Sequence, residues 1–84
     1  LVLYNTLQKL KEKISNGEKN VSKLINWAME NIHSIPSAKV DYIKIVDINT
    51  MEDLESIEEK ALIALAVYIN EKVRLIDNIE IIKE

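Results

Sequence analysis

Few side chains in this 84-residue chain could carry out chemistry, and none stands among the neighbours that an active site needs. With no cysteine and one histidine, His33, the sequence can form no disulfide, no cysteine-based zinc site and no metal site with two histidines. A general base must lie within hydrogen-bond reach of a reacting group, and the pattern around His33 supplies none. We expect His33 instead to act as a cation at the end of a helix, where positive charge is favoured.

Motifs for phosphate binding, nucleophilic attack and calcium binding are also missing from the sequence. The single glycine, Gly17, cannot form a glycine-rich phosphate loop, and the five serines stand outside any nucleophile elbow. The acidic segment 52–59 contains no glycine, which a calcium loop requires at its turn. This acidic segment is therefore predicted to be a solvated connector.

Arg74 and Asp77 are the polar pair of greatest interest, because both lie within an apolar, strand-like stretch. Residues three positions apart point to opposite faces of a regular strand, so these two cannot pair with each other. We expect Arg74 to pair with an acid on the neighbouring strand or on a partner domain, and Asp77 and Asn78 to satisfy local backbone groups. Trp27 and Tyr42 are expected in the core or at a domain interface rather than as stacking platforms.

Charge is divided unevenly along the chain, although the net charge is only −3. Six lysines against three glutamates give the first 40 residues a charge of +3, whereas five basic and eleven acidic residues give the remaining 44 a charge of −6. Nucleic-acid-binding domains are usually basic, so the sequence pI of about 5.2 argues against a nucleic-acid partner. The lysines of the first half are expected to form solvated, mildly positive helix faces.

Length and apolar content indicate one globular domain spanning residues 1–84. A hydrophobic fraction of 48% is too high for a disordered chain, and the longest apolar run, residues 61–69, is far shorter than the ~20 residues of a membrane span. No secretory leader is visible, so we expect a soluble, cytoplasmic protein without a membrane partner. Because the sequence begins at Leu1 rather than methionine, we expect a piece of a longer protein.

Two amphipathic helices are predicted in the first half of the chain. Apolar residues recur with helical spacing over residues 1–15, and Gly17 follows where a left-handed residue would end the helix. A second apolar stripe runs over residues 21–34, with Asn20 as its N-cap and Pro36 as its stop. The short turn between them predicts helices that pack antiparallel or at a steep angle.

Three strands are predicted in the second half. Residues 41–47 are rich in β-branched side chains and alternate in part, with Ile43 and Ile45 on one face. Residues 61–69 fit either a buried strand or a short buried helix. A compact polar turn and the strand-like residues 73–79 follow, and this order favours a hairpin.

The predicted fold class is α+β, a two-layer sandwich in which two N-terminal helices pack on a three-stranded, mainly antiparallel sheet. In the connector between the first two strands, Thr50 and Asp53 resemble a capping box that begins a short helical turn. No internal repeat, low-complexity tract or flexible linker is visible.

Several segments, in order along essentially the whole chain, carry a resemblance to a known family. They are residues 3–7 (LYNTL), 40–47 (VDYIKIVD), 49–51 (NTM), the apolar strand 61–69 and residues 73–79 (VRLIDNI). The most specific part is RLIDN with VDYIKIVD at a fitting distance upstream. Together these segments resemble the C-terminal domain of the pantoate–β-alanine ligase (pantothenate synthetase) family. Two positions depart from its pattern: Asn70 replaces a hairpin glycine, and Met51 replaces leucine.

The resemblance implies a parent enzyme on the coenzyme A pathway that joins pantoate to β-alanine, using ATP with Mg2+ and a pantoyl-adenylate intermediate. It implies an N-terminal Rossmann-like domain, outside this chain, that holds the nucleotide and pantoate sites, and a homodimeric parent. This 84-residue part would be a hinged lid over the ATP site and inactive alone. The family's His-rich and Ser/Arg-containing ATP motifs are not in this sequence, so the resemblance assigns it no catalytic, cofactor-binding or metal-binding residue.

Two other functional classes remain open from the sequence. The residues alone would favour a free-standing α+β module that binds a small ligand or a protein. A nucleic-acid-binding domain is the other class, and the acidic second half opposes it. The coding sequence upstream of Leu1 would separate the module from the lid domain.

Overall fold

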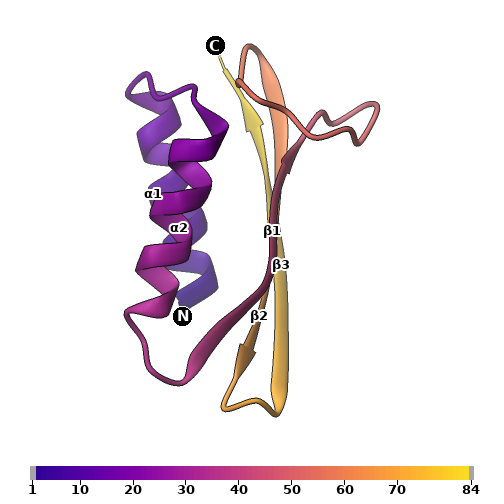
Figure 1. Ribbon diagram of the computed structural model, residues 1–84. Coiled ribbons are helices and arrows are strands. Elements are labelled where there is room, and N and C mark those ends of the chain that lie inside the picture. The colour runs from indigo at the N-terminus through magenta and orange to yellow at the C-terminus, as the bar shows by residue number, and fades with distance from the viewer. Residues whose placement is uncertain (1, 84) are drawn as a thin grey trace.

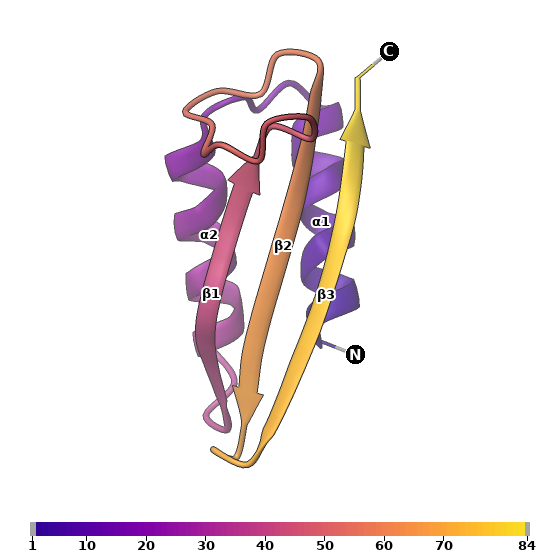
Figure 2. The same ribbon diagram turned by 90° about the vertical axis from the view of Figure 1, so that its right-hand side faces the viewer.

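A computed structural model describes residues 2–83 and shows two helices on one face of a three-stranded antiparallel sheet (Figures 1 and 2). The strand order is β1-β2-β3, and the predicted two-layer α+β sandwich is confirmed. No helix in the described part of the chain is long and apolar enough to cross a bilayer. In chain order the elements are α1 (Val2–Ser15), α2 (Val21–His33), β1 (Ala38–Val46), β2 (Lys60–Ile69) and β3 (Val73–Ile82).

The ends of the helices follow the local signals in the sequence. Gly17 has a φ of +108°, and its N–H and that of Glu18 donate to carbonyls of the last turn of α1, as in a Schellman motif. The side chain of Asn20 accepts a 3.0 Å hydrogen bond from the backbone N–H of Lys23, so the predicted N-cap of α2 is confirmed. The two helices run antiparallel (Figure 1), one of the two predicted arrangements.

The core lies between the helix layer and β2, the central strand. Because successive strand residues point to opposite faces, alternate residues of β2 project toward the helices, and four of them are fully buried. One polar link crosses the helix layer: Asn31 donates a 3.0 Å hydrogen bond to the fully buried Thr6 hydroxyl. The best-covered large side chains are Leu7, Leu10, Leu24, Ile32, Ile45, Ile57, Ile63, Leu65 and Val67.

Strand β1 begins three residues earlier than the predicted residue 41, and a β-bulge explains the difference. Between Val40 and Tyr42 the register with β2 shifts by one residue. The bulge reverses the alternation, so that Ala38 and Val40 face the core before it and Ile43 and Ile45 after it. The predicted shared face of Ile43 and Ile45 is confirmed.

Residues 61–69 are a strand, and the predicted hairpin with β3 is confirmed, with β3 running to Ile82 rather than residue 79. Asn70 and Glu71 both have positive φ, at 54° and 61°, and Lys72 N–H bonds back to the Ile69 carbonyl at 3.1 Å. Two consecutive positive φ angles are the geometry of a type I′ turn, whose twist matches the strands. Asparagine tolerates this conformation, which is why glycine is dispensable at position 70.

The connector forms a different turn from the predicted one, and the capping-box prediction was wrong. Residues 48–50 make the turn, with the carboxylate of Asp47 accepting from the N–H groups of Asn49 at 2.8 Å and Thr50 at 3.0 Å. Asp53 instead forms an isolated bridge with Val46. No helix begins at Thr50, because its Oγ1 accepts from the N–H of Glu52 at 3.2 Å rather than from that of Asp53, and Met51 has a φ of 64°, outside the helical range.

Stability in acid should depend on Asp47. The backbone N–H groups of Thr50 and Asn49 bond the ionised carboxylate and hold the pKa of Asp47 below its usual value. The stabilisation is therefore complete above the unfolded pKa, about 3.9, and is lost as pH falls through the lower folded pKa. Urea denaturation at about pH 7 and about pH 2.5 should show wild type losing more stability than Asp47→Asn. Equal losses of stability in the two proteins would show that the Asp47 carboxylate does not stabilise the fold in this way.

Candidate functional site

The candidate surface is the face of the sheet that points away from the helices, here called the open face, and neither helix covers it (Figure 1). The pairing register aligns its side chains in rows across the three strands. Lys39, Tyr68 and Arg74 form one row. The next rows are Tyr42, Ala66 and Ile76, and then Lys44, Ala64 and Asn78.

An ion pair joins the two outer strands across this face. Arg74 on β3 donates from Nε and Nη2 to Oδ2 of Asp41 on β1, both at 2.9 Å. Adjacent strands lie about 4.8 Å apart, so the pair must span two strand spacings over β2. Ala66 is fully buried between the two outer strands. Its small side chain leaves room for the side chains of Arg74 and Asp41 to meet above β2. The prediction that Arg74 pairs with an acid is confirmed, but the acid lies two strands away rather than on the neighbouring strand.

The bulge in β1 makes this contact possible. It presents Asp41 and Tyr42 together opposite a single residue of β2, and the Arg74 guanidinium lies 5.8 Å from the centre of the Tyr42 ring. The side chains of Arg74 and Asp41 are 41% and 35% exposed, so water still screens the pair. Tyr42 therefore belongs to the open face and not to the core, whereas Trp27 is partly buried and packs against the core.

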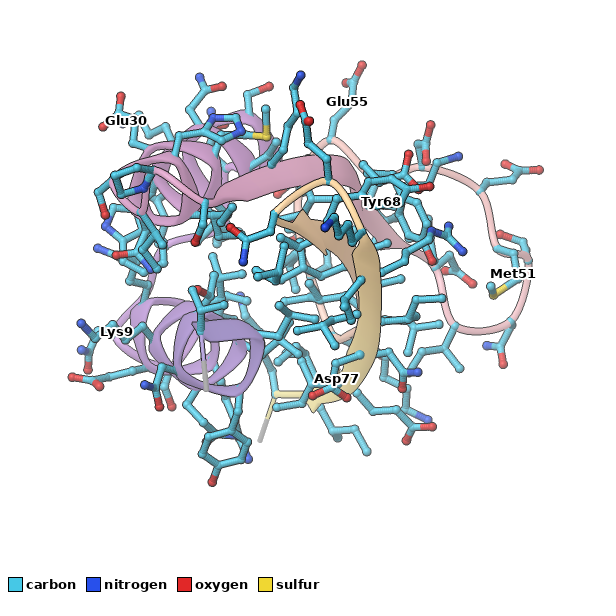
Figure 3. The ribbon with its side chains drawn as sticks, turned by 90° about the horizontal axis from the view of Figure 1, so that it is seen from below. Lys9, Glu30, Met51, Glu55, Tyr68 and Asp77 are labelled. Atoms are coloured by element: carbon cyan, nitrogen blue, oxygen red, sulfur yellow. The ribbon has the colours of Figure 1, made fainter. Side chains whose placement is uncertain are left out.

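The other polar groups of the open face are of kinds that commonly bind ligands. Lys39 and Lys44 provide positive charge and Asn78 provides an amide, whereas Asp41 balances the charge of Arg74 and Glu80 adds a negative charge on the same face. Figure 3, seen along the sheet, shows Tyr68 projecting away from the helices and the Met51 loop reaching over the same side. Lysines and aromatic rings beside the half-buried Ala64 suit contact with an anionic, partly apolar ligand. No nucleophile with an adjacent base stands among these residues.

His33 lies in the last turn of α2, at the helix end where the sequence placed it, and makes one contact that was not predicted. Its Nε2 accepts a 3.3 Å hydrogen bond from the backbone N–H of Val40, beside the bulge. This bond holds the end of α2 against the start of β1. No local pattern indicates this contact, because it depends on where β1 lies against the end of α2.

Asp77 lies where its spacing predicted. It pairs in register with Leu65 and points to the helix side of the sheet, as Figure 3 also shows. Arg74, three positions earlier and paired with Tyr68, points to the opposite side. Its Oδ1 accepts from the N–H of Asn78 at 2.8 Å, which confirms the predicted bond to local backbone.

The acidic connector is tied to the start of α2 by backbone bonds and one ion pair. The Ser56 hydroxyl, donating at 2.7 Å, holds the pKa of Glu58 below its usual range, and Lys19 at 3.2 Å adds to the effect. Ile57, between them, is fully buried. Within residues 2–83, no three acidic or histidine side chains come together as a metal site would require.

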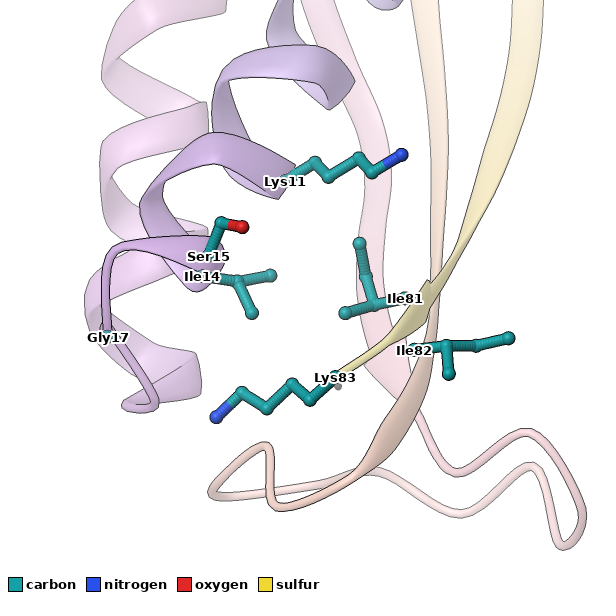
Figure 4. Close-up of a pocket in the computed structure, with 7 residues that line it drawn as sticks. All are labelled: Lys11, Ile14, Ser15, Gly17, Ile81, Ile82 and Lys83. Atoms are coloured by element: carbon teal, nitrogen blue, oxygen red, sulfur yellow. The ribbon is translucent and has the colours of Figure 1, made fainter.

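A groove of about 520 Å³ opens between the end of α1 and the end of β3 (Figure 4). The Nζ of Lys83 donates to the Ile57 carbonyl at 2.9 Å, so one of its two lysines already serves the fold. The apolar packing around Ile14 and Ile81 continues the core rather than forming a separate ligand site. The groove is lined by Lys11, Ile14, Ser15, Gly17, Ile81, Ile82 and Lys83.

Comparisons with known proteins connect this chain to one family. Residues 1–80 match the family model described as pantoate-beta-alanine ligase. The chain is 47% identical over 76 residues to pantothenate synthetase from Fervidobacterium nodosum and 48% identical over 77 residues to that from Thermosipho melanesiensis. A crystal structure of pantothenate synthetase from Thermus thermophilus superposes with a TM-score of 0.79 at 28% identity, over 93% of this chain and 28% of that one.

These matches cover nearly all of this chain but a small share of the relatives. The chain aligns over 90% and 92% of its length, and the alignments span 26% and 27% of the two bacterial enzymes. It therefore corresponds to about a quarter of such a protein. The family model covers almost every residue, and two relatives exceed 45% identity. On these grounds the chain belongs to the pantoate–β-alanine ligase family.

Proposed function

We propose that residues 1–84 are the C-terminal lid domain of a pantoate–β-alanine ligase, a cytoplasmic enzyme of pantothenate biosynthesis. One observation carries this proposal. The chain aligns over nearly its whole length with proteins named pantothenate synthetase, yet the alignment spans only about 27% of their length. The parent enzyme would use ATP with Mg2+, hold its substrates in an N-terminal Rossmann-like domain and form a homodimer. The free-standing module is not favoured by these relatives.

The reaction gives a lid a clear physical task. Pantoate attacks ATP to give pantoyl adenylate and pyrophosphate, and the amine of β-alanine then displaces AMP to form the amide. Water can attack the same acyl adenylate, returning pantoate and AMP without product. Closing the site while the adenylate waits for the amine excludes that water, and a small rigid domain that moves as a body can provide the closure.

The open face is the surface of the domain suited to that closure. The opposite side of the sheet is occupied by α1 and α2, whereas the open face offers the exposed Lys39 and Lys44 beside the half-buried Ala64. A nucleotide and a carboxylate substrate are anions, so positive charge there favours approach. The Arg74–Asp41 bond and the ladders that join the three strands hold this surface in one shape, which suits rigid-body motion.

By itself the 84-residue chain is expected neither to bind ATP measurably nor to make pantothenate. It lacks a glycine-rich loop and a histidine motif, and exposed lysines alone bind phosphate weakly in salt. Amide NMR spectra of the chain should show no saturable shift on addition of millimolar ATP. The full-length enzyme, titrated in the same way, is the control. A saturable shift at one site of the isolated chain would contradict the assignment of the nucleotide site to the rest of the enzyme.

A further inference from the structure

The first residues of β3 are apolar and exposed although they face the helix layer. Val73 pairs with Ile69, and Leu75 pairs with the fully buried Val67, so both point to the helix side. Val73 is nevertheless 54% exposed and Leu75 40%, while Ile81 on the same face is 4% exposed. Cover by the helices therefore stops part-way along the strand.

The cause is a difference in length between α1 and β3. Fourteen helical residues span about 21 Å, whereas ten strand residues span about 33 Å. The last turn of α1 lies against the end of β3, where Ile14 and Ile81 line one groove (Figure 4). Its first turn consequently lies beside the middle of β3, and the hairpin extends beyond it (Figures 1 and 2).

The chain enters the domain at this uncovered place. Val2 opens α1 half-buried against the core, and Tyr4 in the same turn is 56% exposed. Relatives are about three and a half times as long as this chain. The proposed function places the rest of the enzyme upstream, so a segment joined here would start near the exposed residues of β3. A covalently joined segment acts at a high effective concentration, which favours it over a separate molecule.

We propose that, in the full-length ligase, the polypeptide immediately upstream of Leu1 packs on Val73 and Leu75 and extends the helix layer to the hairpin. This inference rests on the proposed function, because it takes the rest of the ligase as the upstream partner. The occupant is an apolar segment of the same chain. The hairpin end of the domain is thereby fixed to the connecting segment, and the open face is left free to close.

Cysteine labelling of the full-length enzyme tests the proposal. Residues 1–84 hold no cysteine, so Val73→Cys, or Leu75→Cys as a second variant, adds one thiol that peptide mass spectrometry can follow with iodoacetamide. The control is Ser22→Cys, at an exposed position on α2. For each thiol, the labelling rate in the native enzyme is divided by its labelling rate in urea. This ratio should be at least about tenfold lower at position 73 than at position 22.

Three results are decisive. Slow labelling at position 73 that persists on dilution supports the proposal. Labelling at 73 as fast as at 22 overturns it, and so does protection that disappears on dilution, because a second copy would then be the occupant. The wild-type enzyme is assayed separately for pantothenate formation, so a failure of the proposed function is seen independently of the labelling.

Discussion

Replacing Leu24 with alanine is expected to lower the free energy of unfolding by roughly 2–4 kcal/mol. Leu24 on α2 is 1% exposed and belongs to the core between helices and sheet. Removing its branched end forfeits burial and leaves a cavity, because close-packed neighbours relax only in part. In a domain of this size such a loss corresponds to a fall in Tm of roughly 10–25 °C.

A matched substitution at an exposed leucine provides the control. Leu75→Ala removes the same atoms from a side chain that is 40% exposed, so its effect on thermal unfolding of the 84-residue chain should be much smaller. Equal shifts for the two variants would mean that α2 does not pack on this sheet in solution.

Placing a large side chain on the open face should disable the parent enzyme while the domain stays folded. Ala64 lies half-buried between Lys44 and Asn78, on the floor of the face proposed to close. In the full-length enzyme, Ala64→Tyr should lower kcat by roughly 100-fold, because a misplacement of about 1 Å at a closing site has effects of that size. Tyrosine favours strands, so the melting temperature should change little.

The comparison variant is Ser22→Tyr, which adds a similar bulk on the exposed side of α2. It should leave kcat within about twofold of wild type, since surface changes away from a working site are usually neutral. An active, stable Ala64→Tyr enzyme would show that another surface of the domain faces the substrates.

Local signals allowed most of the fold to be predicted. The ends of both helices depend on Gly17 and Asn20, whose effects are complete within a few residues, and the hairpin depends on a turn that asparagine can adopt. The connector was mispredicted although its signals are also local. Aspartate and threonine are both good capping residues, so the sequence does not show whether Asp47 or Thr50 organises the turn. That choice depends on where β1 ends.

The candidate surface was predictable only in part. Spacing within β3 separates Arg74 from Asp77, but the Asp41 partner depends on a bulge and on two strand pairings. The His33 contact with β1 likewise requires the packed structure. One usable signal was overlooked: Ala64 and Ala66 alternate with larger apolar residues in β2. This alternation predicts that one face of the strand carries bulky side chains and the other carries small ones.

The central claim is that this domain closes over an acyl adenylate made elsewhere in the same enzyme. The most direct test is to count AMP and pantothenate formed from pantoate, β-alanine and ATP by the full-length enzyme and its Ala64→Tyr variant. We predict one AMP per pantothenate for the wild type, and an excess of AMP for the variant, because water reaches the adenylate in a site that cannot close. No pantothenate from the wild type, or an unchanged ratio in a slowed variant, would contradict the account.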